Sequence, residues 1–216
     1  MQFQKVEKSS YKTTTWAHGE TTEFYIFPKE SNYEQREFLW RVSSATVTSD
    51  TSEFTALFGV KRWIMPFDAP LFLTHTHNGK PLYSITLNPY ESHCFKGDWA
   101  TQSRGKARDF NLMLKEGAYG IVKPVKLIST GPKDLGHLFQ EAFDERLPLA
   151  EHQLTLGFYS LENDFAIETL EDSFSCTGGE MMFIHYTMEE VDLVKEFVIS
   201  TQKETVSHIV LFAITY

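Results

Sequence analysis

Short runs rich in Phe, Tyr, Val, Ile and Thr recur along the whole chain, and Gly, Pro, Asn or Asp interrupts them at short intervals. These residue types fit the half-buried surface of a pleated strand, and the spacing of the breaks is typical of a sandwich or barrel. An excess of aromatic residues, with 18 Phe, 9 Tyr and 4 Trp, favours the same interpretation. About fourteen strands are predicted from this pattern, at Thr22–Phe27, Phe38–Thr48, Phe54–Leu57, Arg62–Pro66, Leu71–His77, Leu82–Leu87, His93–Phe95, Phe110–Leu114, Ile121–Ile128, Gln153–Tyr159, Phe165–Leu170, Glu180–Tyr186, Phe197–Thr201 and His208–Tyr216.

Helical periodicity is scarce by comparison. One convincing pattern runs from Asp134 to Phe143, with apolar residues at 135, 138, 139 and 142 and Asp134 as a candidate cap. The segment Glu189–Glu196 fits either a helical turn or the start of a strand. A parallel α/β sheet needs a helix at nearly every crossover, so we predict an all-β protein with at most one or two short helices.

Two glycine-containing turns support the predicted strand boundaries. Asn78-Gly79 lies between two apolar runs and predicts a hairpin, because a type I′ turn needs positive φ at both central residues. Thr177-Gly178-Gly179 predicts a second tight turn.

The distribution of charge argues against a nucleic-acid partner. Residues 1–133 hold 17 Lys or Arg against 13 Asp or Glu, whereas residues 134–216 hold 3 against 16. The second part of the chain would therefore repel a phosphate backbone. The longest apolar run, Ile209–Ile214, is far shorter than the roughly 20 residues of a membrane-spanning helix, so no membrane partner is expected either.

Two cysteines, Cys94 and Cys176, are too few for a disulfide framework. Met1–Tyr11 contains no apolar stretch of the kind found in secretory signals, so we expect reduced thiols in a cytoplasmic protein. Both cysteines are expected to pack as small hydrophobic side chains rather than to act as nucleophiles.

The predicted strand Phe38–Thr48 carries an arginine among apolar neighbours. Alternation places Arg41 and Ser43 on the same face as Leu39, Ala45 and Val47. An isolated buried guanidinium is very costly, so this side chain must pair with a carboxylate or face a ligand.

A second arginine and a carboxylate lie on other predicted strands, and they too would need a partner or a ligand if they are buried. Arg62 shares a face with Ile64, and Asp109 and Asn111 share a face with Met113. Two interpretations follow for the polar groups. Either both arginines form structural ion pairs with Asp98 or Asp109, or these side chains line a binding site.

Several segments between Thr13 and Gly120 carry a family resemblance through their order and spacing. They are Trp16–Glu23, Trp40–Ala45, Phe54-Thr55 with Gly59 and Arg62, Phe95–Asp98, and Asp109–Met113. Together they resemble the HutD/Ves family. The family's usual Gly-Gly after the first Trp is replaced by Ala17-His18, which is expected to alter that loop. Beyond Gly120 the resemblance is only a pattern of strands.

The resemblance implies a bicupin, which is a chain with two jelly-roll β-barrels, without the metal ligands that many cupins carry. We place the first barrel at residues 1–120 and the second, acidic barrel at 121–216. The barrels would join within residues 121–148, with the predicted helix nearby. Family members are associated with histidine utilisation or with stress responses, and no reaction is established for them.

The triplet His75-Thr76-His77 is the most metal-like motif, since alternate strand residues share a face and imidazole suits several transition metals. In metal-binding cupins a Glu follows the second His by four or five residues, where this chain has Pro81 and Leu82. A closed metal site needs more than two protein ligands. We therefore expect no bound metal and no other cofactor.

Three functions remain open. In the first, which we favour, the amino-terminal barrel binds a small anionic metabolite with a carboxylate and acts as a sensor or regulator. In the second, the chain is a metal-free isomerase or hydrolase with His75 or His77 as general base beside Asp109. In the third, aromatic-rich faces bury a protein partner, for which a homodimer is one candidate. No catalytic residue is assigned, and the candidate ligand-binding residues are Arg41, Ser43, Arg62, His75, His77, Asp109 and Asn111.

Overall fold

The structure is a computed structural model that describes residues 1–128, 131–142, 153–201 and 206–216. Its backbone divides into two compact units. The amino-terminal unit is Ser10–Ala118, and the carboxyl-terminal unit consists of Met1–Ser9 and Tyr119–Tyr216. Each unit contains two antiparallel β-sheets.

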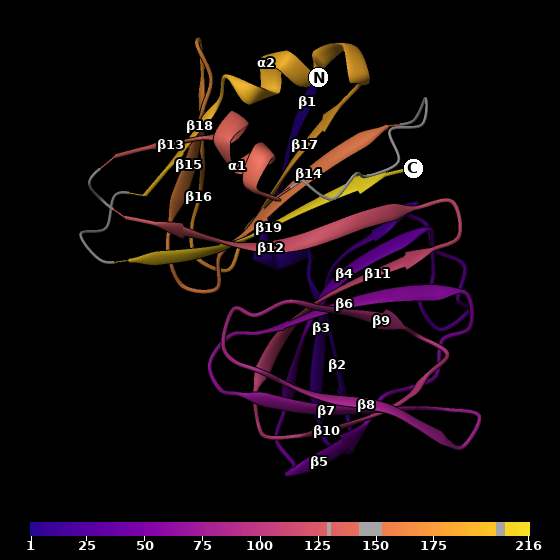
Figure 1. Cartoon of the computed structure of the whole chain (residues 1–216). Helices are drawn as coiled ribbons and strands as arrows, with labels where there is room; N and C mark the ends of the chain where they lie inside the picture. Colours follow the sequence, from indigo (N-terminus) through magenta and orange to yellow (C-terminus); the bar gives the residue numbers. More distant parts are fainter. Residues whose placement is uncertain (129–130, 143–152, 202–205) are drawn as a thin grey trace. The chain divides into compact units, whose positions relative to one another are not determined.

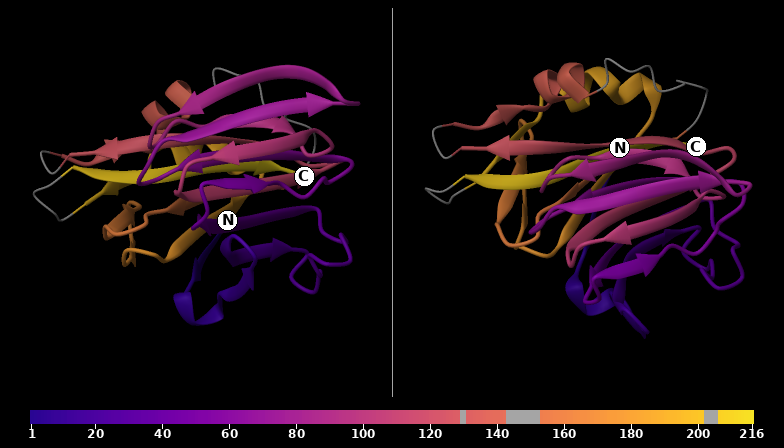
Figure 2. Two further views of the ribbon diagram at one scale, coloured as in Figure 1. Left: turned by 90° about the horizontal axis from the view of Figure 1, so that it is seen from below. Right: turned by 60° about the horizontal axis from the view of Figure 1, so that its bottom comes forward.

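The amino-terminal unit, drawn from indigo to magenta in Figure 1, contains a six-stranded and a four-stranded sheet. The six-stranded sheet has the order β2 (Lys12–Trp16), β3 (Gly19–Phe27), β4 (Trp40–Val47), β11 (Arg108–Lys115), β6 (Val60–Pro66) and β9 (His93–Lys96). The four-stranded sheet has the order β5 (Thr51–Glu53), β10 (Ala100–Arg104), β7 (Leu71–His77) and β8 (Lys80–Leu87). The same strands can be followed from two other directions in Figure 2.

Apolar side chains from both sheets form a common core in this unit. The cluster contains Ile64 and Phe95 from the six-stranded sheet and Leu71, Leu73 and Leu87 from the four-stranded sheet. Sheet-on-sheet burial of this kind explains why these strands alternate between apolar and polar residues.

The turn chemistry predicted for the hairpin between β7 and β8 is confirmed. Asn78 has φ 51° and Gly79 has φ 72°, as a type I′ turn requires. The strand predicted at residues 54–57 is wrong, because β5 ends at Glu53. Beyond β5 the backbone N–H groups of Phe54 and Leu57 donate to the carbonyls of Thr101 and Gly97 instead of continuing a ladder.

The carboxyl-terminal unit also has two sheets. The five-stranded sheet has the order β1 (Gln2–Val6), β17 (Met181–Tyr186), β14 (Leu154–Tyr159), β19 (Ser207–Thr215) and β12 (Tyr119–Leu127). The four-stranded sheet has the order β13 (Lys133–Asp134), β18 (Val198–Ser200), β15 (Phe165–Glu168) and β16 (Ser173–Cys176).

Strand β1 was not predicted. It places the first residues of the chain beside β17, which lies in the last third of the sequence. It pairs antiparallel with β17, so that Gln2 faces His185 and Val6 faces Met181. The expected first barrel of residues 1–120 therefore differs from the amino-terminal unit at its start, where residues 1–9 belong to the other unit. A local pattern in one sequence does not indicate which distant strand will be a partner.

Short helices occur in the carboxyl-terminal unit. Helix α1 (Leu135–Ala142) lies where a helix was predicted, and Asp134 Oδ1 accepts a hydrogen bond of 3.2 Å from the backbone N–H of His137, as an N-cap does. The predicted end at Phe143 lies outside the described residues.

The segment Glu189–Glu196, which the sequence left open between helix and strand, falls on a 3-10 turn η2 (Met188–Glu190) and helix α2 (Val191–Lys195). A further 3-10 turn, η1 (Lys8–Ser10), follows β1.

Strands make up most of the described chain, and every strand pair in it is antiparallel. The predicted all-β class with a few short helices is confirmed. No helix in the part of the chain that the structure describes has the length and apolar character needed to cross a membrane.

Candidate functional site

Strand register brings the predicted polar residues of the amino-terminal unit onto one face of the six-stranded sheet. Arg41 faces Met113 across β4 and β11, and Met113 faces Arg62 across β11 and β6. Ser43 faces Asn111, two residues further along the same strands. Because residues two apart share a face, these side chains project to the same side of the sheet.

That face lines a cavity of about 520 Å³ within the amino-terminal unit. The volume lies in the range of small-molecule sites, which are about 300–1,000 Å³. Five of the seven predicted ligand-binding residues line it: Arg41, Ser43, Arg62, Asp109 and Asn111. The sequence did not single out the cavity's other charged residues, which are Lys12, Glu23, Glu34 and Glu53.

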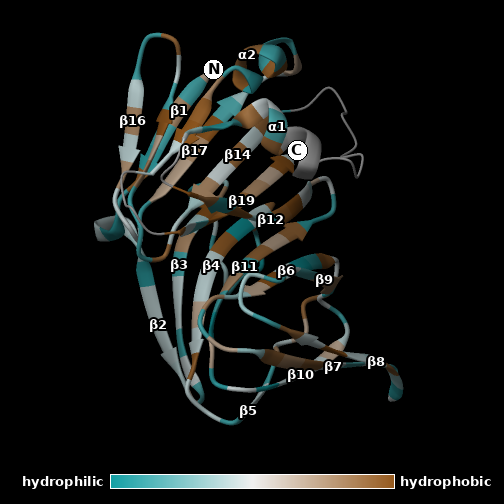
Figure 3. Ribbon diagram, turned by 60° about the vertical axis from the view of Figure 1, so that its left-hand side comes forward, coloured by the Kyte–Doolittle hydropathy of each residue, from teal (hydrophilic) through white to brown (hydrophobic). Residues whose placement is uncertain are grey.

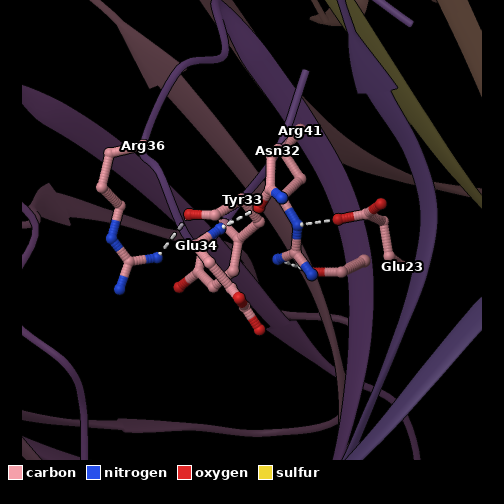
Figure 4. Close-up of polar contacts among 7 residues, drawn as sticks. Glu23, Asn32, Tyr33, Glu34, Arg36 and Arg41 are labelled. Atoms are coloured by element: carbon pink, nitrogen blue, oxygen red, sulfur yellow. Dashed lines mark hydrogen bonds and ion pairs between the residues drawn. The ribbon is translucent and has the colours of Figure 1, made fainter. Parts of the chain in front are cut away.

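Arg41 is buried and engages neighbours on three sides. Its Nε donates to Glu23 Oε2 at 2.7 Å, and its Nη1 donates to Ser43 Oγ at 3.0 Å (Figure 4). Its guanidinium carbon lies 4.1 Å from the centre of the Tyr33 ring. The carboxylate partner is thus Glu23, not the expected Asp98 or Asp109. Arg41 thus has a charged and a neutral hydrogen-bond partner within the chain.

The loop between β3 and β4 places Tyr33 over this arginine (Figure 4). A second guanidinium, that of Arg36, lies 4.3 Å from the same ring, and its Nη1 donates to the Tyr33 carbonyl oxygen at 2.9 Å. Asn32 Oδ1 accepts a hydrogen bond of 2.7 Å from the backbone N–H of Glu34, which fixes the turn. Residues 31–34 of this loop form part of the cavity wall. Two cation–π contacts therefore hold the aromatic wall in place.

Arg62 is also buried, but it lacks the carboxylate partner that Arg41 has. The residue is 7% exposed, and its guanidinium carbon lies 4.8 Å from the Phe54 ring centre and 5.4 Å from that of Phe95. Its Nη1 donates to the Thr55 carbonyl oxygen at the long distance of 3.4 Å, and its buried Nε has no hydrogen-bond partner. Burial lowers the pKa of Arg62 to about 10. No ion pair between described residues includes Arg62, so the structure does not show the first of the two interpretations, a pairing with Asp98 or Asp109.

Asp109 and Asn111 form a buried polar pair on β11. The Nδ2 of Asn111 donates to Asp109 Oδ1, whereas Asn111 Oδ1 is buried without a partner. Burial raises the pKa of Asp109 to about 7, although the backbone N–H of Ala45 and the charge of Arg62 act in the opposite direction. The cavity therefore contains a carboxyl group that changes charge near neutral pH.

The structure separates the two predicted histidines from this cavity. His75 lies on β7 in the other sheet, is 0% exposed, and contacts Thr101 Oγ1 through Nδ1 at 2.9 Å and His93 Nε2 through Nε2 at 3.2 Å. Burial and the neighbouring His93 lower the pKa of His75 to about 4. His77 is half-buried and follows a register shift between His75 and Thr76. Neither histidine lines the cavity that contains Asp109.

The side chains near His75 can be compared with the ligand set of a metal centre. Within the described ranges, no group of three or more His, Cys, Asp and Glu side chains is arranged to hold a metal ion. His75 and His93 meet directly, and Tyr83 Oη also contacts His93 Nε2 at 3.3 Å.

Cys176, at the end of β16, is buried, which raises the pKa of its thiol to about 12. Its packed position agrees with the expectation of a small hydrophobic side chain.

Sequence reasoning missed Glu23 and Tyr33, both central to the site. Glu23 immediately precedes a register shift between β3 and β4, and such an irregularity is not visible as a simple alternation. Tyr33 lies in a loop without periodicity, so its position depends on tertiary contacts, among them those with Arg36, Arg41 and Phe38. An aromatic residue between charged residues in a loop is too common to have indicated either contact.

Three solved structures resemble the chain at low sequence identity. A conserved protein of unknown function from Pseudomonas aeruginosa PAO1 is 15% identical with a TM-score of 0.72, covering 100% of both chains. HutD from Pseudomonas fluorescens SBW25 is 16% identical with a TM-score of 0.63, covering 99% of this chain and 98% of that one. A formate complex of oxalate decarboxylase from Lactobacillus farciminis is 7% identical with a TM-score of 0.62, covering 97% and 85%. These likenesses show a cupin-like jelly-roll fold and confirm the bicupin expectation.

Sequence comparison shows the family directly. No match was found among curated proteins. A family model described as HutD matches residues 8–169, which is more than half of the 216 residues and extends well beyond the segments that first suggested the resemblance. The chain therefore belongs to the HutD family.

Proposed function

We propose that the cavity of the amino-terminal unit binds a small metabolite through a carboxylate, and that Arg62 is the residue that holds it. One observation carries the proposal. Arg62 is a buried guanidinium on the cavity wall without an ion-pair partner, and its Nε lacks any hydrogen bond. A buried charge of this kind is costly unless another group compensates it.

A carboxylate is the compensating group that fits best. Its two oxygens match the planar fork of a guanidinium, and the resulting charge-assisted hydrogen bonds are among the strongest in proteins. Arg41 provides a second positive charge on the same face, but Glu23 and Ser43 already accept hydrogen bonds from it. We therefore assign the direct contact to Arg62 and a supporting electrostatic role to Arg41. Ser43 and Asn111 would add neutral hydrogen bonds.

Binding without turnover is the function that this geometry supports. The second hypothesis needs His75 or His77 as a general base beside Asp109, and the cavity wall contains neither. The assembly hypothesis has no comparable observation in its favour. Members of the HutD family are associated with histidine utilisation, so we place the protein's role as a sensor or regulator of that breakdown pathway, without a metal. Its ligands would be pathway intermediates or other small carboxylates.

Calorimetric titration of the full chain with formate, acetate, L-histidine and L-glutamate tests the proposal. Arg62→Met should weaken binding of any carboxylate that the wild type binds by about ten- to a hundredfold, because a charge-assisted pair is lost. Arg104→Met is the matched control, since Arg104 is exposed on β10 and does not line the cavity. The proposal fails if no carboxylate binds to the wild type, or if Arg62→Met binds as tightly as the control.

A further inference from the structure

Two side chains that line the cavity each carry a buried polar atom without a partner, and the two atoms have opposite hydrogen-bonding character. Arg62 Nε is a donor, and Asn111 Oδ1 is an acceptor. Arg62 is 7% exposed and Asn111 is 5% exposed. Buried polar groups in folded proteins are nearly always satisfied, so each unpaired atom on a cavity wall indicates what a ligand must supply.

The two atoms belong to neighbouring positions of the sheet. Arg62 faces Met113 across β6 and β11, and Asn111 is two residues from Met113 on the same strand. Asn111 is therefore a diagonal neighbour of Arg62, with backbones about 7–8 Å apart. A ligand of a few heavy atoms can span that separation and contact both side chains.

Asp109 determines which end of the Asn111 amide remains available. The Nδ2 of Asn111 donates to Asp109 Oδ1, which leaves Oδ1 of the amide as the unpaired atom. An amide oxygen accepts hydrogen bonds and cannot donate them. Asp109 is thus a positioning residue, and the group that meets Asn111 must carry an N–H or O–H.

We infer that the cavity selects carboxylates that also carry a hydrogen-bond donor close to the carboxylate, as amino acids and hydroxy acids do. This inference rests on the proposed function, because Arg62 must first bind the carboxylate. It adds that Asn111 Oδ1 accepts a hydrogen bond from the ligand's donor. A ligand without the donor leaves Asn111 Oδ1 buried and unpaired, which costs about tenfold in affinity.

Matched ligands separate this inference from the proposed function. Propionate, L-lactate and L-alanine have the same carbon skeleton and differ at one carbon, which carries hydrogen, a hydroxyl or an ammonium group. Titration of the wild type should give about tenfold tighter binding of lactate and alanine than of propionate. Glutarate and L-glutamate form a second matched pair for a larger ligand. Binding of propionate and lactate with equal affinity would leave the proposed function standing and overturn the inference.

Substitution of Asn111 identifies the group responsible. Asn111→Leu keeps the size of the side chain and removes the acceptor, so the preference for lactate over propionate should disappear while propionate binding persists. Asn111→Ala is the second variant, since it also removes the acceptor and introduces no large apolar group. Circular dichroism establishes that each variant is folded. Arg62→Met should weaken all of these ligands by similar factors.

The remaining outcomes are equally decisive. A preference that survives in the folded Asn111 variant overturns the inference. So does a preference for alanine alone, since the cavity's carboxylates Glu23, Glu34 and Glu53 would then attract the ammonium group without help from Asn111. Failure of the wild type to bind any carboxylate removes the proposed function itself.

Discussion

The two units bury different chemistry on sheets of the same antiparallel construction. In the amino-terminal unit, the buried residues include four that can carry charge: Arg41, Arg62, His75 and Asp109. In the described part of the carboxyl-terminal unit, the buried polar residues carry only hydroxyl groups: Thr155, Ser160, Ser207 and Thr215. The hydropathy colouring of Figure 3 shows related differences, with brown segments on β14, β17 and β19 and mainly pale ones on β2.

The two units differ in whether their buried polar groups find hydrogen-bond partners within the chain. Thr155 finds partners within the chain, since its Oγ1 lies 2.8 Å from His185 Nδ1 and 3.2 Å from the Tyr216 hydroxyl. Arg62 Nε and Asn111 Oδ1 find none. Buried polar groups normally pair within the protein, so those left unpaired beside a cavity indicate ligand contacts.

The largest expected effect is on the packed interior of the carboxyl-terminal unit. Phe158 is 1% exposed on β14, and Phe158→Ala should lower the free energy of unfolding by about 3–5 kcal/mol through lost burial and the cavity left behind. Urea denaturation measures the change. Phe58→Ala is the control, because Phe58 is 82% exposed, and its effect should stay within about 0.5 kcal/mol. Equal effects of the two substitutions would contradict the packing described here.

The next largest expected effect is a pH dependence of the unfolding free energy, which originates at Asp109 in the amino-terminal unit. Burial raises the pKa of Asp109 from 3.8 to about 7, so between these values the folded state keeps a proton that the unfolded state has lost. Stability from this group is therefore present below about pH 4 and is lost as pH rises towards 7, by up to about 4 kcal/mol. Asp109→Asn cannot ionise, so the difference in unfolding free energy between variant and wild type should grow from pH 4 to pH 7. A difference that is constant over this range would show that Asp109 titrates normally.

Substitution of the two cavity arginines should have smaller effects on the free energy of unfolding, and the two effects should have opposite signs. Arg41→Met leaves Glu23 without its partner and should lower the free energy of unfolding by about 2 kcal/mol. Arg62→Met removes a buried charge without a partner, and an apolar side chain of similar length should raise the stability by about 1–2 kcal/mol. Melting temperatures of both variants, measured without ligand, test this. A loss of stability in both would mean that Arg62 is a structural residue as well.

The smallest effect concerns a helix end in the carboxyl-terminal unit. Asp134→Ala removes the side-chain acceptor at the start of α1 and should cost about 1 kcal/mol. Asp134→Asn keeps an acceptor oxygen and should retain most of the stability. Thermal unfolding of the two variants compares them directly, and equal melting temperatures would argue against the cap.

Local sequence patterns determined much about this protein. Runs of β-branched and aromatic residues predicted the β-class, because such side chains fit a pleated surface and the repeated breaks permit only short strands. Asn78-Gly79 predicted its hairpin, since both backbone conformations are intrinsic to these residues. Alternation placed Arg41 with Ser43, and Asp109 with Asn111, on one face of their own strands. These inferences succeeded because they depend on neighbours within a few residues.

Only the tertiary structure decided what these local patterns could not. The pairing of β1 with β17 joins residues about 180 positions apart in sequence, and no local pattern specifies such a partner. The register shift after Glu23 and the loop that contains Tyr33 bring a carboxylate and an aromatic ring to Arg41, whereas Arg62 Nε has no hydrogen-bond partner. The sequence indicated that a buried arginine must be compensated. Which arginine has a carboxylate partner within the chain, and which has none, depends on long-range packing.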